Sequence, residues 1–242
     1  MSPLLDVRQL SKSFRGLKAV TGASFEVPVG GLTALIGPNG AGKTTIFNMV
    51  AGVYAADSGE IRFCGNPIGG LRADQVCAAG IGRTFQIVKP FAGLSVIDNV
   101  MVGALLREKG VPAAKRHAAG IVEKLGLGAK RDLPAASLTL PDRKRLEVAR
   151  ALATRPRLLL LDEVMAGLRP TECDQMVELF RELNRRDGLT ILLIEHVMRA
   201  VMALAKEIVV LHHGEIIARG SPEQVVRDPA VLECYLGEEA EV

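Results

Sequence analysis

The chain has 242 residues and a formal net charge of +3, since 30 Lys and Arg stand against 27 Asp and Glu. Apolar types make up 48% of the residues and charged types 24%, a composition that fits a globular protein and excludes intrinsic disorder or a collagen-like repeat. The near-neutral charge gives no argument for nucleic-acid binding. A chain of this length forms either one large domain or two smaller lobes.

The four cysteines lie far apart in the sequence, without a C-x-x-C pair. Their spacing favours neither a zinc site nor a disulfide framework, and it fits a reducing compartment. Residues 1–14 carry charged side chains and lack the apolar centre of a signal peptide. No stretch approaches the roughly 18 consecutive apolar residues of a membrane-spanning helix, so we expect no transmembrane segment.

The first third of the chain alternates apolar and polar residues with the period of half-buried strands. The alternation covers residues 5–10 and 24–27 and predicts antiparallel strands. A wholly apolar strand, Leu32–Ile36, then runs into a glycine-rich segment that precedes a predicted helix over residues 43–51. Residues 61–63 alternate again between turn signals and indicate a short edge strand.

The middle of the chain, residues 87–150, is predicted to be mainly helical. From Ser95 onward apolar residues recur at helical spacing, and Asp98 follows Ser95 at the distance of a capping box. Residues 113–125 and 143–153 also predict helices.

The last third alternates short apolar strands with helices. Such an alternation predicts a parallel sheet with helices on its faces, so the fold class is α/β. The helical middle is then an insert in this α/β domain and not a tethered second domain. The predicted strands cover residues 158–161, 190–194, 208–211 and 215–218, and the predicted helices cover 172–185 and 197–205.

The segment between the strand Leu32–Ile36 and the next helix matches G-x-x-x-x-G-K-T/S, the pattern of a phosphate-binding loop. Its glycines let backbone N–H groups face phosphate oxygens, and the following helix N-terminus favours the same negative charge. The alternative is a glycine-rich turn with a surface lysine, which the flanking strand and helix disfavour. The residues expected to bind a nucleotide here are Gly37, Pro38, Asn39, Gly40, Ala41, Gly42, Lys43, Thr44 and Thr45.

Two carboxylates follow the apolar strand Leu158–Leu161. Asp162 and Glu163 stand where a buried strand leaves the core, and such charges need a polar site to be tolerated. We expect Asp162 and the Thr44 hydroxyl to hold Mg²⁺, and Glu163 to polarise the water that attacks the γ-phosphate. The guanine-selecting tetrapeptide N-K-x-D is absent from the sequence, which favours ATP over GTP.

With these motifs in this order, the chain resembles the ATP-binding subunit of an ABC transporter over nearly its whole length. The resemblance implies that Gln86 reaches Mg²⁺ and the attacking water, that His196 contacts the γ-phosphate, and that Phe14 stacks on adenine. It also implies the fold: a P-loop NTPase with a mainly parallel sheet, an N-terminal antiparallel β subdomain and a helical insert. Residues 1–242 would form a single domain, with a catalytic core at 1–86 and 151–242 and a helical subdomain at 87–150.

Within the family, four segments most resemble the ATPases of branched-chain amino acid importers. This implies an ATP-hydrolysing motor for such amino acids or related small polar solutes, bound peripherally at the cytoplasmic face of the inner membrane. The implied partners are permease subunits, a second ATPase subunit and, indirectly, a solute-binding protein, with no nucleic acid. The four segments are Ile81–Gln86, Asn99–Gly103, Leu193–His196 and Asp228–Gly237.

One motif departs from the family. The signature Leu-Ser-Gly-Gly-Gln, which completes the ATP site of the partner subunit, is replaced by Leu138-Thr-Leu-Pro-Asp142. Thr139 keeps a hydroxyl for the partner's nucleotide and caps the following helix, with Asp142 completing a capping box. Pro141, however, has no N–H to give to a phosphate, and Asp142 adds a negative charge. We therefore expect an impaired partner site and a heterodimer.

Two other classes of protein remain open. A soluble ABC-type ATPase of translation or DNA repair usually carries tandem cassettes or long coiled-coil insertions, which 242 residues do not accommodate. A regulatory, weakly hydrolysing nucleotide-binding module is compatible with the altered signature. The basic cluster Arg143–Arg145 has acidic neighbours, and we interpret it as a solvated helix face and not as a nucleic-acid site.

Overall fold

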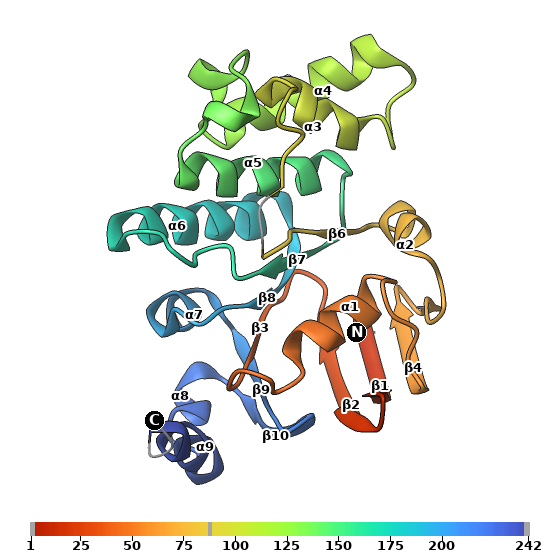
Figure 1. The fold of residues 1–242 in the computed structure, drawn as a ribbon, viewed down its shortest axis with the longest axis vertical. Helices are drawn as coiled ribbons and strands as arrows, with labels where there is room; N and C mark the ends of the chain where they lie inside the picture. Colours follow the sequence, from red (N-terminus) through yellow and green to blue (C-terminus); the bar gives the residue numbers. More distant parts are fainter. Residues whose placement is uncertain (1–2, 87–88, 240–242) are drawn as a thin grey trace.

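The computed structural model describes residues 3–86 and 89–239, whose arrangement is shown in Figure 1. The alternating N-terminal residues form a long antiparallel hairpin that is widened by two further strands. Its strand order is β2-β1-β4-β5, and β1 pairs antiparallel with both β2 and β4, as the alternation predicts for these strands. The strands are β1 (Leu5–Phe14), β2 (Leu17–Val27), β4 (Ser58–Phe63) and β5 (Asn66–Pro67).

The wholly apolar strands form a second sheet, in the order β10-β9-β3-β8-β7-β6. Neighbouring strands are parallel except β10 and β9, which are antiparallel. The expected fold class, an α/β P-loop fold with a mainly parallel sheet and an N-terminal antiparallel sheet, is confirmed. The strands are β3 (Leu32–Ile36), β6 (Ile81–Arg83), β7 (Leu158–Asp162), β8 (Thr190–Ile194), β9 (Glu207–His212) and β10 (Glu215–Gly220).

Nine α-helices lie within the described residues, and six of them were expected from the sequence. The unexpected ones are the short α2 and α8 and the C-terminal α9. The helices are α1 (Lys43–Val50), α2 (Ala73–Ala79), α3 (Val96–Ala104), α4 (Val111–Lys124), α5 (Leu140–Ala153), α6 (Pro170–Asp187), α7 (Met198–Leu204), α8 (Pro222–Val225) and α9 (Pro229–Glu239).

Two hydrophobic cores lie on opposite faces of the parallel sheet. In β7, Leu158 and Leu160 enter the core shared with α1 and the antiparallel sheet, whereas Leu159 and Leu161 enter the core shared with α3–α7. Successive residues of a strand point to opposite faces, so a strand covered on both sides must be apolar throughout. The polar residues that follow such a strand therefore mark the point where it leaves the core.

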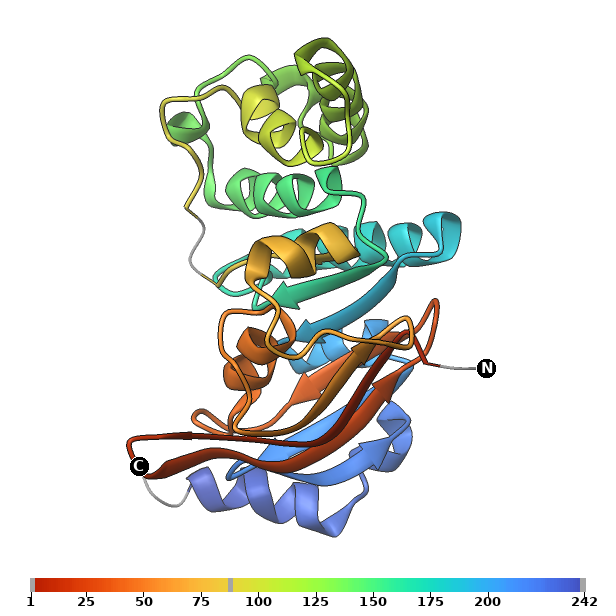
Figure 2. The ribbon, with the colours of Figure 1, turned by 90° about the vertical axis from the view of Figure 1, so that its right-hand side faces the viewer.

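The helices α3, α4 and α5 stack at one end of the molecule, beyond α6 (Figure 2). Ser95 is the N-cap of α3, and its hydroxyl accepts the N–H of Asp98, as expected. The expected boundary between core and helical subdomain falls at residues 87–88, which lie outside the described residues. In residues 3–86 and 89–239, no helix has the length and apolarity needed to cross a membrane.

Candidate nucleotide-binding site

The loop from β3 to α1 is pressed against its neighbours so closely that only glycine fits at two positions. A Cβ on Gly37 would lie 1.9 Å from the carbonyl oxygen of Leu211, and one on Gly42 would lie 2.3 Å from that of Ala19. Gly42 also has a φ of 103°, a value that side chains disfavour. The glycines of this motif thus fix the loop between two strands.

The N-terminus of α1 faces the concave side of this loop. Its N-cap is Gly42, with no side-chain cap, and no acidic residue stands in its first turn. The first N–H groups of the helix are therefore left to an anion. Lys43 is buried, and its Nζ donates to the carbonyl oxygens of Gly37 at 2.6 Å and Pro38 at 2.7 Å, which places the charge over the loop.

The register of three parallel strands brings distant polar residues to one edge of the sheet. Arg83 pairs with Leu160 in β6 and β7, and Asp162 pairs with Ile194 in β7 and β8. Gln86 lies three residues after Arg83, and Glu163 lies three residues after its partner Leu160, so the two side chains end side by side. His196 follows the end of β8. The carboxylate of Glu163 accepts the Nε2–H of Gln86 at 2.6 Å and lies 2.9 Å from Nε2 of His196.

A cavity of about 270 Å³ separates this trio from the glycine-rich loop. The structure thus brings together most of the expected site residues: seven from the loop and the three expected catalytic residues. Ala19 of β2 completes the lining. The lining residues are Ala19, Asn39, Gly40, Ala41, Gly42, Lys43, Thr44, Thr45, Gln86, Glu163 and His196.

Asp162 is buried just beyond this cavity. Its Oδ2 accepts the guanidinium of Arg83 at 2.9 Å, while its buried Oδ1 has no hydrogen-bond partner. Burial raises the pKa of Asp162, and the bond from Arg83 opposes this rise. A buried carboxylate oxygen without a donor, together with the Thr44 hydroxyl and the Gln86 amide, fits a hard cation such as Mg²⁺, which needs only one or two protein carboxylates when phosphates supply other ligands.

Arg83 lies in the site, although no sequence motif assigns it a role there. Besides Asp162, its guanidinium donates to Oδ1 of Asn48 at 2.6 Å, so it joins α1 to the end of β7. Thr84 has a related role, since its Oγ accepts the N–H of Asp162 at 3.1 Å. The sequence offered one sign of this role, a basic residue inside the segment that ends in Gln86. Its partner Asp162 could not be predicted, because the contact depends on which strands pair.

Phe14 lies at the end of β1 and is not among the residues that line the cavity. Its ring is 38% exposed and meets Tyr54 edge to face, with centroids 5.3 Å apart. The Lys12 ammonium lies over the same ring, 5.6 Å from its centroid. A partly exposed aromatic ring on this hairpin is compatible with stacking on a base.

Thr139 does not line this cavity. It is the N-cap of α5, as expected, but the expected capping box is wrong: its side chain accepts no helix N–H. The hydroxyl instead donates to Oδ2 of Asp142 at 2.7 Å, and Lys130 donates to the same oxygen at 2.5 Å. Burial raises the pKa of Asp142, but the bonds from Lys130 and Thr139 outweigh it, so the pKa is lowered and the carboxylate is charged.

Glu195, between β8 and His196, should make the stability of the fold depend on pH, because its pKa differs between the folded and unfolded chain. Burial raises its pKa from 4.5 to about 7, although the N–H of Met165, 2.8 Å from its carboxylate, favours the charged form. Between these pH values the folded chain holds a proton that the unfolded chain has released, so stability is full below pH 4.5 and falls as pH rises through 7.

We therefore expect the free energy of unfolding to fall by up to about 3 kcal/mol between pH 4.5 and 8 on account of this group. The Glu195→Gln variant should lack this part of the decline, because an amide does not titrate in this range. Urea denaturation of both proteins across this pH range measures the difference. Parallel stability curves would contradict the raised pKa of Glu195.

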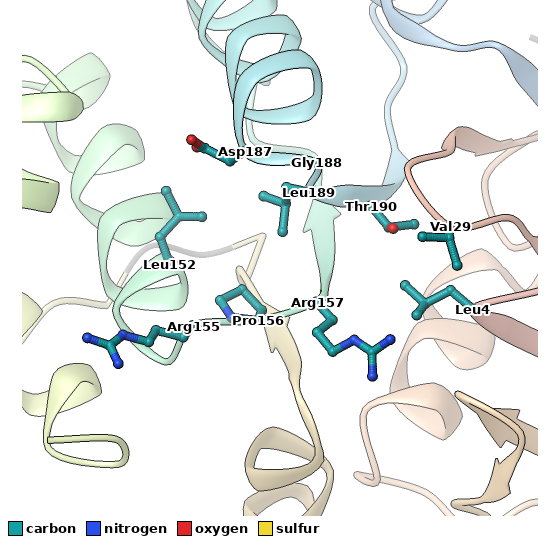
Figure 3. A pocket seen from close by; sticks show the side chains of 10 residues that line it. All are labelled: Leu4, Val29, Leu152, Arg155, Pro156, Arg157, Asp187, Gly188, Leu189 and Thr190. Atoms are coloured by element: carbon teal, nitrogen blue, oxygen red, sulfur yellow. The ribbon is translucent and has the colours of Figure 1, made fainter.

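Figure 3 shows the side chains that line a second cavity, also of about 270 Å³. Its lining includes Arg157 and Leu189, which directly precede β7 and β8, so it sits at the amino ends of the parallel strands. Ligands of open α/β sheets bind at the carboxyl ends, where the glycine-rich loop lies. The second cavity is therefore not part of the candidate site.

Comparison with protein families finds two matches. Residues 20–166 match the family described as ABC transporter, and residues 215–241 match the family described as branched-chain amino acid ATP-binding cassette transporter. The second match covers β10 and the C-terminal helices, none of whose residues line the cavity between the glycine-rich loop and Glu163.

Two curated relatives are similar over almost their whole length. The high-affinity branched-chain amino acid transport ATP-binding protein BraF of Pseudomonas aeruginosa is 38% identical, and LivG of Escherichia coli, of the same description, is 39% identical; each alignment covers 98% of both chains. Among solved structures, the ADP conformation of MJ1267, an ATP-binding cassette of an ABC transporter, is 30% identical with a TM-score of 0.89, covering 98% of this chain and 100% of that one.

Proposed function

The chain belongs to the ABC transporter family and is an ATP-hydrolysing subunit, and we propose that its transporter imports branched-chain amino acids or related small polar solutes. One observation carries the catalytic part: a glycine-rich phosphate cradle faces Gln86, Glu163 and His196 across a single cavity. The proposed cargo is supported by the names of the relatives and by the match of residues 215–241 to the branched-chain amino acid family.

We propose that the loop from Gly37 to Thr45 holds the triphosphate. The N–H groups at the start of α1 and the Lys43 ammonium neutralise the β- and γ-phosphates. Phe14, supported by Tyr54, stacks on the adenine at the mouth of the site. Thr44, Gln86 and Asp162 would hold Mg²⁺, which supplies further neutralisation of phosphate charge when bound.

Hydrolysis then depends on where the trio places a water molecule. Glu163 lies between Gln86 and His196, within hydrogen-bond distance of both. Its carboxylate orients the water and takes up its proton, while His196 donates toward the γ-phosphate and Gln86 fixes the geometry. Catalysis by such a site consists mainly of positioning and charge stabilisation.

A permease subunit is implied by membership of the family, and we propose where it docks. A hollow of about 200 Å³ beside Gln86 is lined by Phe85, Phe91 and Val102, all exposed, with the buried Glu147 at its base. The guanidiniums of Arg83 and Arg150 lie over the two aromatic rings. The hollow joins the helical subdomain, residues 87–150, to the core, residues 1–86 and 151–242, so a permease segment seated there would follow movement between them.

We propose a heterodimer of ATPase subunits at the cytoplasmic face of the membrane, with a solute-binding protein acting on the permease. The signature segment of this chain is poorly suited to a partner's phosphate. Pro141 has no N–H, Asp142 is charged, and the Thr139 hydroxyl already donates to Asp142. The same features favour the second candidate, a weakly hydrolysing regulatory module, if the partner supplies most of the turnover.

Uptake of radiolabelled leucine by cells that lack this subunit tests the proposed function. We expect uptake to be lost and then restored by the intact chain, but not by Lys43→Ala, which removes the charge over the phosphate cradle. Unchanged leucine uptake in the deficient cells would overturn the proposed cargo. Restoration by Lys43→Ala would instead indicate a structural role without ATP-driven transport.

A further inference from the structure

Lys144 is a buried cation that the site described above does not use. It lies on α5, in the helical layer, with only 4% of its surface exposed. Its Nζ donates to the carbonyl oxygen of Glu163 at 3.0 Å and, more weakly, to that of Gln86 at 3.5 Å. The expectation that the basic cluster Arg143–Arg145 forms a solvated helix face is therefore wrong at this residue.

The backbone that Lys144 contacts is strained at Glu163. The φ of Glu163 is 49°, in the left-handed region that side chains disfavour. Such a conformation persists only where the surroundings hold it. Here the N–H of Glu163 donates to the carbonyl oxygen of Ile194 at 2.9 Å, and its own carbonyl accepts the Lys144 ammonium at 3.0 Å and the N–H of Ala166 at 3.3 Å. These bonds hold the peptide groups on both sides of Glu163.

The orientation of this backbone decides where the Glu163 carboxylate points. In the strained conformation the carboxylate reaches both Gln86 and His196. If φ relaxed to a negative value, the side chain would leave this position, because it is attached to the rotating unit. Lys144 is the contact from the helical layer that opposes this relaxation.

The charges around Lys144 explain why an ammonium is tolerated there. Burial lowers its pKa, while the carboxylates of Glu195, Glu163, Glu147 and Asp162 oppose this effect. The ammonium does more than balance these negative charges. Its hydrogen bonds to carbonyl oxygens also fix the position of the backbone that it contacts.

We propose that Lys144 is a positioning residue that holds Glu163 and Gln86 in their hydrolytic arrangement and makes that arrangement depend on the placement of α5. This inference rests on the proposed role of Glu163 as the group that orients the attacking water. Because the contact joins the helical layer to the ends of β6 and β7, a displacement of α5 would break it and release Glu163.

The first test compares ATP hydrolysis by the intact transporter, purified through a tag on this chain, for three variants. We expect Lys144→Met, which keeps the unbranched chain but removes the ammonium, to lower kcat by roughly 10–100-fold with ATP affinity unchanged. Lys144→Arg should recover most of the rate, since a guanidinium also donates to two carbonyls. Arg107→Met is the control, because Arg107 joins the helical layer to the core through the carbonyls of Ala78 and Thr154, away from Glu163.

The second test follows amide hydrogen exchange by NMR in the isolated chain, which needs no turnover. The Glu163 amide should exchange faster in Lys144→Met but not in Arg107→Met, while amides in the core of β3 keep their protection in both. A kcat equal to that of the unaltered chain, or unchanged exchange at Glu163, would overturn the proposal. Failure of the proposed role of Glu163 is distinguishable, since it would show as undiminished hydrolysis in Glu163→Gln, whatever the exchange rates.

Discussion

Replacing Glu163 with Gln is expected to lower ATP turnover of the assembled transporter by about 10²–10⁴-fold, the contribution of a general base, without weakening ATP binding. The carboxylate accepts the Gln86 amide and lies beside His196, so it is the group placed to receive a proton from water. An amide of the same shape can occupy the position but does not take up that proton.

The measurement pairs steady-state phosphate release with equilibrium binding of a fluorescent ATP analogue. Glu178→Gln serves as the matched control, because it makes the same chemical change at an exposed site on α6, away from the cavity. A rate for Glu163→Gln equal to that of this control would remove Glu163 from the role of base. Loss of binding together with turnover would point to a defect in folding or in the phosphate cradle.

The phosphate-binding half of the site could be predicted because its information is local. The spacing of Gly37, Gly42 and Lys43 within one turn-and-helix segment determines the loop, and the structure adds only the reason: two of these glycines lie against carbonyl oxygens of distant strands. The spacing of apolar residues along the chain also predicted most strands and helices. The four-residue α8 was not predicted because a single turn shows no periodicity.

The other half depends on strand pairing, which no local pattern contains. Arg83 meets Asp162 because β6 lies beside β7 in a particular register, and a shift of one residue would turn both side chains to other faces. Lys144 was misjudged for a related reason: its helix looks amphipathic in isolation, but α5 is covered on more than one side. The resemblance to the family supplied Gln86 and His196, which the residues alone would not have singled out.

Restoring the signature motif is expected to convert this chain into one that dimerises with itself in the presence of ATP. The segment now presents Pro141, which has no N–H, and a charged Asp142 that binds Thr139 and Lys130 within the same chain. That carboxylate also occupies the positive end of the α5 dipole. A phosphate of a facing subunit thus meets a negative charge, and Pro141 offers it no N–H.

The variant carries four changes, Thr139→Ser, Leu140→Gly, Pro141→Gly and Asp142→Gln, in a Glu163→Gln background that retains ATP. Hydrogen bonds to a charged group contribute roughly 1.5–3 kcal/mol each. One restored contact in each of two sites should therefore tighten the ATP-bound dimer by roughly 10²–10⁴-fold. Size-exclusion chromatography with light scattering, over a range of protein concentrations, measures this change.

Two controls separate the causes. Adding Lys43→Ala should abolish the dimer, since ATP would no longer be held between the subunits, and Pro141→Ala alone should have a smaller effect because Asp142 remains charged. The unaltered signature in the Glu163→Gln background should stay monomeric with ATP. Equal dimerisation of that chain would mean that Thr139 and its neighbours complete a partner site after all, and the proposed heterodimer would lose its physical basis. Dimerisation only after the restoration would mean that the intact signature belongs to a different subunit of the transporter. The partner's signature would then complete the ATP site of this chain.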